Sequence, residues 1–309
     1  MKVSVIVPVY NGESDLPDLI ECLRSQTVSP GEVEYFVVDN NSSDRTSEIL
    51  QAATPFVTPL NEPKIQSSYA ARNVGIRAAK GEILAFTDAD CRPQPNWLEK
   101  LIAPFSNPEI GLSVGEVLAF PGETLFEKHA DRRNILSQKY TLNHPFLPYG
   151  QTANLAVRRS LFDRVGLFRP YLTTAGDADL CWRVLQETEA KLEFVPEAIV
   201  KHRHRATLDE LLSQMRRYGK AEVYLHELHG IDLSPNPKTS DRAKIWARWF
   251  IKVLPTHLAK AIVNKADWVD LWETPLNALK ARARIASRDR TKLPENARYI
   301  ERLHDTESD

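Results

Sequence analysis

The sequence predicts an α/β protein built on a doubly wound, mostly parallel sheet flanked by helices. Up to about residue 120, short β-branched runs alternate with segments whose apolar residues recur every three or four positions. This βαβαβ rhythm is typical of parallel sheets, because parallel strands need crossover connections. The first strand-like run, Val3–Val9, is continuously apolar, as expected for a strand buried on both faces. With 309 residues, the chain can hold one large domain with an appendage, or two modest domains.

Three strands and three helices are expected in this first part of the chain. In order, they are strand Val3–Val9, helix Glu13–Gln26, strand Glu34–Val38, a helix through Leu50, helix Ser67–Ala79 and strand Glu82–Thr87. The first helix carries Leu16, Leu19 and Leu23 at helical spacing. Ser43 and Asp44 are suitable N-caps for the helix through Leu50.

The pattern becomes mixed after Pro121. Here we expect helix Glu123–Tyr140, a Pro-rich loop at 144–149, a short element at 155–157, helices near Ser160 and Asp177, and strand Leu192–Val200. Thr207 and Glu210 form a capping box that opens a helix through about Leu228. The predicted domains are therefore a main domain at 1–230, a linker at 231–240 that includes Ser234–Pro237, and a helical C-terminal extension at 241–309.

Composition excludes several classes of protein. A chain with 42% hydrophobic residues is not a disordered tail or a collagen-like repeat, and its net charge of −1 gives no support for a nucleic-acid binder. Cys22, Cys91 and Cys181 lack a CxxC-type spacing, which argues against a disulfide framework or a structural zinc. The apolar N-terminal run is too short for a signal peptide, and no stretch reaches 18 apolar residues. We therefore expect a cytoplasmic protein, with peripheral contact to the inner face of a membrane left open.

Acidic residues follow two of the predicted strands. Asp39 ends the second strand, and Asp88 and Asp90 follow the third. Open α/β sheets bind ligands at this edge, and an Asp-x-Asp turn can direct a carboxylate to Mg²⁺ or Mn²⁺. The alternative is that these acids only cap turns and helices. Because the chain has no GxGxxG after its first strand and no P-loop, a nucleotide would have to be held otherwise, for example through a metal on its diphosphate.

Two further clusters have both a structural and a chemical interpretation. Asp177 and Asp179 lie at a helix start, where acids are favoured by the helix dipole, and either could serve as a general base. The run from Lys201 to Arg205 alternates basic residues with His202 and His204. This run is either a solvated strand edge or a site where an imidazole binds a metal and the cationic side chains bind phosphate.

Six segments, taken together, resemble the family 2 glycosyltransferases, which have a GT-A-type nucleotide-diphospho-sugar fold. They occur in the family's order over about residues 1–230, at 3–11, 37–46, 71–76, 81–91, 153–159 and 177–183. The resemblance implies an inverting transfer of a sugar from a nucleotide-diphosphate donor to an acceptor hydroxyl. The acceptor would be a polysaccharide, a lipid-linked glycan or a similar molecule.

The resemblance also implies roles for individual residues. Pro8, Tyr10 and Asp39 should hold the nucleotide base, and Asp88 should lie near the ribose or the sugar, with Arg72 also in the donor site. The metal, Mg²⁺ or Mn²⁺, should bind Asp90, with His202 as the best-matching histidine and His204 second. Asp177 should be the catalytic base, with Asp179 as the alternative. The family usually has Glu before this Asp, whereas this chain has Gly176.

The near-zero net charge conceals a basic, Trp-rich segment. Residues 242–292 contain 12 Lys and Arg against 4 Asp and Glu, which leaves a charge of −9 for the rest of the chain. Such a mixture fits a helix lying on an anionic membrane surface, and equally a helix packed on the main domain with its basic face in water.

Two other functions remain as alternatives. A sugar-1-phosphate nucleotidyltransferase would need a Gly-rich, Arg-containing loop after the first strand, where this chain has Tyr10-Asn11-Gly12-Glu13. A catalytically inactive, membrane-associated scaffold of the same fold would retain the nucleotide pocket. The presence of Asp39, Asp90 and Asp177 argues against the scaffold, and Gly176 argues mildly for it.

Overall fold

The computed structural model describes residues 2–233, 235, 239–262 and 268–304, which form two compact units. The first, here called the sheet unit, comprises the chain up to Phe120, Leu136–Arg203 and the chain from Pro294 on. The second, the helical unit, comprises Pro121–Ile135 and His204–Leu293. Most of the predicted linker Ser234–Pro237 lies outside the described residues. The boundaries 1–230, 231–240 and 241–309 stay a prediction.

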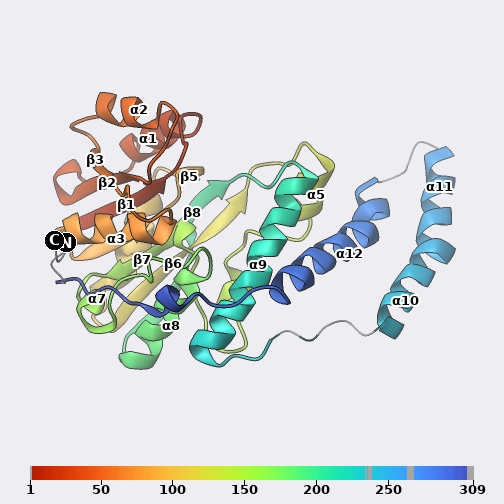
Figure 1. Ribbon diagram of the computed structural model, residues 1–309. Coiled ribbons are helices and arrows are strands. Elements are labelled where there is room, and N and C mark those ends of the chain that lie inside the picture. The colour runs from red at the N-terminus through yellow and green to blue at the C-terminus, as the bar shows by residue number, and fades with distance from the viewer. Residues whose placement is uncertain (1, 234, 236–238, 263–267, 305–309) are drawn as a thin grey trace. The chain divides into compact units, whose positions relative to one another are not determined.

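In the described part of the chain, the sheet unit contains an eight-stranded sheet with the order β3-β2-β1-β4-β7-β6-β8-β5 (Figure 1). The strands are β1 Val3–Val9, β2 Val33–Asp39, β3 Thr58–Asn61, β4 Ile83–Phe86, β5 Cys91–Pro93, β6 Ile110–Ala119, β7 Leu155–Arg158 and β8 Lys191–His202. β3, β2, β1 and β4 are parallel to one another, as are β6 and β8. β7 is antiparallel to both of its neighbours, and β5 to β8, so the sheet is mixed.

Strand register brings the candidate site residues to one edge of the sheet. Val9 pairs with Asp39 between β1 and β2, and Ile6 pairs with Phe86 between β1 and β4. The carboxyl ends of these parallel strands therefore open on the same edge, which carries the turn containing Asp88 and Asp90.

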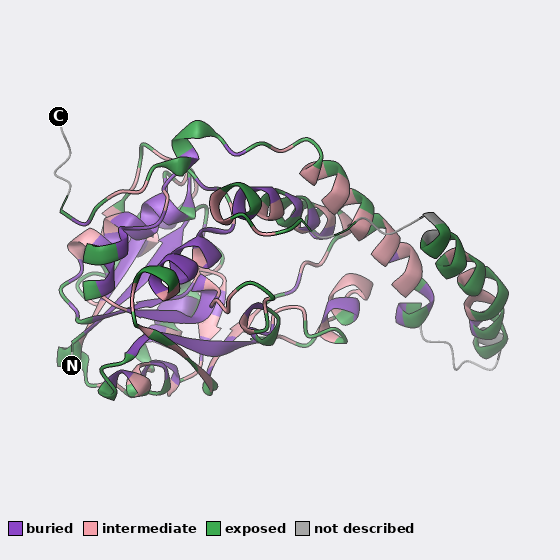
Figure 2. Cartoon of the chain, turned by 90° about the horizontal axis from the view of Figure 1, so that it is seen from below, coloured by how far each residue is buried: buried purple, intermediate pink, exposed green. Residues whose placement is uncertain are grey.

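Helices cover both faces of this sheet, which confirms the predicted doubly wound architecture. They are α1 Leu16–Arg24, α2 Thr46–Ala52, α3 Ser68–Ala78, α4 Trp97–Ile102, α7 Ser160–Val165 and α8 Gly176–Glu187. Figure 2 shows the strands of the sheet largely in the buried colour. On one face, Val5 and Val7 belong to a core with Leu19 and Trp97. On the other, α3 approaches β1 so closely that a Cβ at Gly75 would lie 2.5 Å from Cγ2 of Ile6. Short 3-10 turns lie at Pro30–Glu32, Ala103–Ser106, Thr152–Asn154 and Glu295–Arg298.

The prediction of one continuous helix over Glu123–Tyr140 is wrong in its middle part. The chain forms two short helices, α5 Leu125–Asp131 and α6 Lys139–Leu142. Between them Asn134 has a φ of 47°, in the left-handed region that a right-handed helix cannot accommodate. The N-cap of α2 is Arg45 rather than Ser43 or Asp44, although the Asp44 carboxylate accepts a hydrogen bond from the Thr46 N–H.

The helical unit contains α5 together with the helices that follow the sheet. These are α9 Leu208–His229, α10 Thr239–Arg248, a π-helical turn at Trp249–Val253, α11 Leu254–Ile262 and α12 Trp268–Arg288. The predicted capping box opens α9, since Thr207 accepts from the N–H of Glu210 and Glu210 accepts from the N–H of Thr207. α9 packs along α12, where the Ser287 hydroxyl donates to the carbonyl of Arg216. Among the described residues, none of the helices combines the length and hydropathy that crossing a bilayer requires.

The chain beyond α12 returns to the sheet unit. Glu301 accepts hydrogen bonds from Asn73 at 3.0 Å and Arg77 at 2.8 Å, both on α3. Its backbone carbonyl accepts from the N–H of Leu167 at 2.8 Å. The C-terminal segment is therefore part of the sheet unit, not of the helical one.

Candidate active site

A carboxylate and an imidazole meet at the sheet edge where Asp88 and Asp90 lie. The backbone N–H of Cys91 donates to the carbonyl of Asp88, which closes a tight turn after β4. β5 then pairs with β8 so that Cys91 lies opposite His202. This register places Nε2 of His202 3.2 Å from Oδ2 of Asp90.

Burial and the neighbouring carboxylates act on the pKa of His202 in opposite directions. Burial lowers the pKa of His202, whose side chain is 12% exposed. The hydrogen bond and the negative charge of Asp90, together with the charge of Asp88, outweigh burial and raise the pKa of His202 above its ordinary value. The imidazole thus lies in a strongly negative environment that also favours a cation.

These two side chains fit a divalent metal. Within the described residues, Asp90, Cys91 and His202 offer ligand atoms that lie within 4.8 Å of one another. The Cys91 thiol is fully buried, burial raises its pKa far above the ordinary value, and its soft sulfur is not a ligand that Mn²⁺ or Mg²⁺ prefers. The carboxylate oxygen and the imidazole nitrogen that remain suit Mn²⁺, and the carboxylate suits Mg²⁺.

Arg72 and Tyr69 of α3 connect Asp88 to Asp177. The Arg72 guanidinium, 3% exposed, donates to Oδ1 of Asp88 at 2.5 Å and lies 5.5 Å from the centre of the Tyr69 ring. The Tyr69 hydroxyl is 3.5 Å from Oδ1 of Asp177. Burial raises the pKa of Asp177, an effect that the positive charge of Arg72 opposes. The charge of Asp88 contributes to raising the pKa of both Asp177 and His202.

Tyr69 also fills the space beside Gly176. A Cβ at Gly176 would lie 2.7 Å from Cζ of Tyr69, which is closer than such atoms approach. The Tyr69 ring, stacked on Phe168, therefore occupies the volume where a side chain at position 176 would begin. Sequence reasoning missed Tyr69, although the unusual glycine before Asp177 was a signal that another residue fills its place.

Asp179 has a different environment from Asp177. It is fully buried, and its two oxygens are bound by Arg169 at 3.0 Å and Arg183 at 2.9 Å. Arg183 also donates to the carbonyls of Val165 and Leu167, which lie at and beyond the end of α7. These contacts tie α8 to the end of α7 and identify Asp179 as the centre of a buried ion-pair network.

The loop after β1 and the loop after β2 are joined at the same edge. Asn11 donates its backbone N–H to the Ser42 hydroxyl, and its side-chain oxygen accepts from the N–H of Ser43. Asp39 accepts from the N–H of Ser42 at 2.9 Å, so its carboxylate is held at the end of β2. Pro8 is buried in β1, whereas Tyr10 is 57% exposed just beyond it.

The structure thus brings five predicted residues, Arg72, Asp88, Asp90, Asp177 and His202, into one cluster linked by contacts and charge. Asp39 lies at the end of β2, on the edge that also carries the Asp88–Asp90 turn. His204 is separate, because its Nε2 pairs with Asp131 at 2.9 Å within the helical unit.

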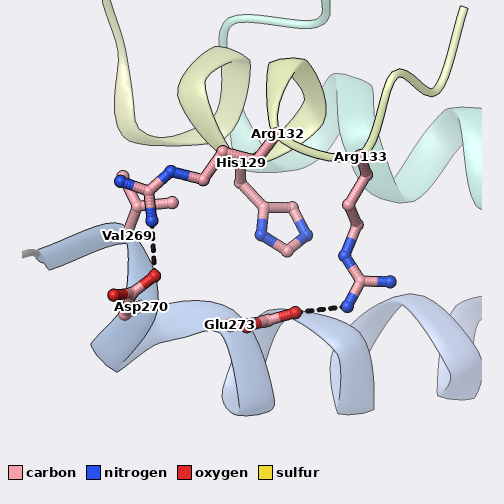
Figure 3. A pocket seen from close by; sticks show the side chains of 6 residues that line it. All are labelled: His129, Arg132, Arg133, Val269, Asp270 and Glu273. Carbon is pink, nitrogen blue, oxygen red and sulfur yellow. Dashed lines mark hydrogen bonds and ion pairs between the residues drawn. The ribbon is translucent and has the colours of Figure 1, made fainter.

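A second group of titratable side chains lies in the helical unit, around a pocket of about 180 Å³ between α5 and α12. Figure 3 shows the His129 imidazole between two ion pairs, Arg132 with Asp270 and Arg133 with Glu273. His129 is 2% exposed, and among the described residues its Nε2 has no hydrogen-bond partner. Burial and the charges of Lys280 and Arg133 lower its pKa from 6.5 to about 4.

The depressed pKa of His129 predicts acid destabilisation. The unfolded state takes up the proton near pH 6.5 and the folded state only near pH 4, so stability should fall as the pH drops through this interval. A shift of this size corresponds to a loss of up to about 3 kcal/mol. Urea unfolding of wild type and His129→Gln between pH 4 and 7.5 measures the difference. The variant should lack this part of the decrease, and an equal decrease in both proteins would contradict the prediction.

Comparison with solved structures gives the class of the protein. The mannosyltransferase PcManGT of Pyrobaculum calidifontis, solved with GDP-Man and Mn²⁺, superposes with a TM-score of 0.64 at 17% identity, over 94% of this chain and 88% of that one. Glucosyl-3-phosphoglycerate synthase of Mycobacterium tuberculosis, solved with Mn²⁺, UDP-Glc and phosphoglyceric acid, gives a TM-score of 0.54 at 22% identity, over 77% and 81%. At these identities the match defines the fold, which is that of the GT-A glycosyltransferases.

Comparison of sequences then gives the family. The model of glycosyl transferase family 2 matches residues 4–173, and the chain belongs to this family. Glycosyltransferase AglE of Haloferax volcanii is 35% identical over 236 residues, covering 75% of this chain and 76% of the relative. The pre-mycofactocin glycosyltransferase of Mycobacterium tuberculosis is 29% identical over 239 residues, and the match spans about half of its length, 49%. The chain is a glycosyltransferase.

Proposed function

We propose that this glycosyltransferase moves a sugar from a nucleotide-diphosphate donor to an acceptor hydroxyl by a single, inverting displacement. The observation that carries the proposal is the cluster in which Asp90 and His202 lie beside Arg72, Asp88 and Asp177 at the ligand-binding edge of the sheet. Proteins of the same fold have been solved in complex with GDP-Man or UDP-Glc together with Mn²⁺, which supports this class of donor and cofactor.

Asp90 and His202 would hold the divalent metal, Mn²⁺ or Mg²⁺. When bound there, the metal would neutralise the negative charge that develops on the departing nucleotide diphosphate. Arg72 would hold Asp88 in a fixed orientation through their 2.5 Å contact, and Asp88 would accept hydrogen bonds from the ribose or sugar hydroxyls. Asp39, together with Pro8 and Tyr10, would bind the nucleotide base at the neighbouring strand ends.

Asp177 is the better candidate for the base that removes the proton from the acceptor hydroxyl. It is only partly buried, and its raised pKa makes its carboxylate a stronger proton acceptor. Asp179 is fully buried and bound by two arginines, so it is inaccessible to an acceptor. The Tyr69 ring occupies the volume where a glutamate side chain at position 176 would begin, beside Asp177.

The acceptor would be a polysaccharide or a lipid-linked glycan. Residues 1–230 would then form the catalytic domain, 231–240 the linker, and 241–309 an extension whose basic part, 242–292, reaches an anionic membrane surface. A cytoplasmic enzyme, peripheral on the inner face of the membrane, would meet a lipid-linked acceptor there.

A thermal-shift screen of UDP-, GDP- and dTDP-sugars with and without Mn²⁺ tests the proposed function. We expect one donor to raise the melting temperature only when the metal is present, and the same donor to be hydrolysed slowly in a subsequent assay. Metal-dependent stabilisation without turnover would instead favour the inactive scaffold, to which the glycine at 176 draws attention. No stabilisation by any donor would contradict the proposed donor class.

A further inference from the structure

The segment formed by α10, the π-helical turn and α11 exposes large apolar side chains. Ile251 is 79% exposed, and Ile245, Phe250 and Leu258 are each more than half exposed. Ile251 and Leu258 are seven residues apart and therefore lie on the same side of the helix. Figure 2 shows this part of the chain mostly in the exposed colour. Single exposed apolar residues are ordinary, but a group of them along one short segment indicates a contact surface.

Another side of the same segment contacts α12 within the helical unit. The Trp249 indole N–H donates to the carbonyl of Leu271 at 2.9 Å, and Nε2 of His257 lies 3.9 Å from Oδ2 of Asp270. Both partners belong to α12. These contacts fix how the segment is turned, so Ile251 and Leu258 face away from α12.

Cations accompany the exposed apolar residues. Lys244, Arg248 and Lys252 follow one another at four-residue intervals, and all three are exposed, as is Lys260. Between residues 239 and 262 the chain has five Lys and Arg and one acidic residue. The row of cations favours an anionic partner, and the apolar side chains favour one with a hydrocarbon interior.

We propose that the side of α10–α11 bearing Ile251, Leu258 and the cations Lys244, Arg248 and Lys252 docks on an anionic lipid bilayer. The helix lies parallel to the membrane, with the apolar side chains below the headgroups and the cations among them. Trp246 and Phe250, which contact Trp249 at ring distances of 5.7 and 4.9 Å, sit at headgroup depth, where aromatic residues are enriched. A nucleic acid would satisfy the cations but not Ile251 and Leu258.

The inference narrows the membrane contact proposed for residues 242–292 to one side of α10–α11, and it rests on the proposed function only for the role of that contact in sugar transfer. Vesicle binding is measured without donor or acceptor. A failure of docking therefore leaves the transfer assay unaffected, and a failure of transfer leaves docking unaffected.

The test is co-sedimentation of the full-length chain with vesicles of phosphatidylcholine alone or with one third phosphatidylglycerol. We expect binding to the anionic vesicles that weakens at least tenfold between 0.1 and 0.5 M salt, because salt screens the cations. The triple variant Lys244→Glu/Arg248→Glu/Lys252→Glu, and separately Ile251→Glu/Leu258→Glu, should each lower the partition coefficient at least tenfold.

Leu233→Glu is the matched control, because it places a charge on an exposed leucine between α9 and α10. It should bind like wild type, and all variants should keep the circular dichroism of the parent. Docking is refuted if the wild type does not bind anionic vesicles, or if both face variants bind as well as Leu233→Glu. A third outcome would also refute docking: the wild type does not bind vesicles but forms a dimer on ultracentrifugation, and Ile251→Glu/Leu258→Glu does not. The exposed side of α10–α11 would then be a contact with a second copy of the chain.

Discussion

The variant Asp177→Asn is expected to lose sugar transfer by about 10²–10⁴-fold while keeping its melting temperature. Asparagine preserves the shape of the side chain but cannot take a proton from the acceptor hydroxyl. Because burial raises the pKa of Asp177, the wild-type kcat/KM should fall on the acid side at a pH above the ordinary aspartate value of 3.8, and the variant should lack this limb. Transfer assays across pH, with donor binding measured separately, check both expectations.

Asp179→Asn is the informative comparison, because it makes the same chemical change two residues away. Its carboxylate neutralises Arg169 and Arg183 in the interior, so the substitution leaves two buried cations without their partner. We expect a loss of roughly 3–5 kcal/mol in the free energy of unfolding. Should Asp177→Asn retain full activity, or should Asp179→Asn be stable and inactive, the assignment of the base would pass to Asp179.

The second large effect is expected from Asp90→Ala. Removing the carboxylate takes away a ligand for the metal, and the charge stabilisation of the leaving group, worth several kcal/mol, goes with it. Transfer should fall by about 100-fold or more, and the extra thermal stabilisation that Mn²⁺ gives to the donor complex should disappear. The readouts are a transfer assay and a melting curve with donor, each with and without Mn²⁺.

Asp18→Ala serves as the control for Asp90→Ala. Asp18 is a more exposed carboxylate on α1 that contacts Arg92 at 3.3 Å. Its loss should change neither transfer nor the response to Mn²⁺. Unchanged metal dependence in Asp90→Ala would remove Asp90 from the metal site, and the cluster with His202 would need another explanation.

Much of the fold could be predicted because its central strands are locally unambiguous. β1, β2 and β4 are continuous apolar runs that end in polar turns, and their burial confirms the sequence pattern. β6 was missed because Gly111, Ser113 and Gly115 interrupt its apolar residues. Glycine and serine are weak strand formers, and burial among β7 and β8 overrides their propensity. β5 is only three residues long and contains a proline, so no local signal defines it.

The candidate site shows the same division between local and tertiary information. The residue types at strand ends and helix starts could be read directly, which is why Asp88, Asp90 and Asp177 were predicted. What the sequence could not supply was the pairing between distant segments. His202 reaches Asp90 only through the β5–β8 register, and Asp179 is distinguished from Asp177 only by the arginines packed around it.

The return of the C-terminal segment to α3 has a topological consequence. Residues 204–293 leave the sheet unit and re-enter it, and Glu301 fastens the far end to Asn73 and Arg77. The long helical stretch is thus a closed loop with two attachment points, and not a free tail. The closure entropy of a flexible loop grows by only about 0.6 kcal/mol for each doubling of its length, so lengthening an exposed connection between these helices should cost the sheet little.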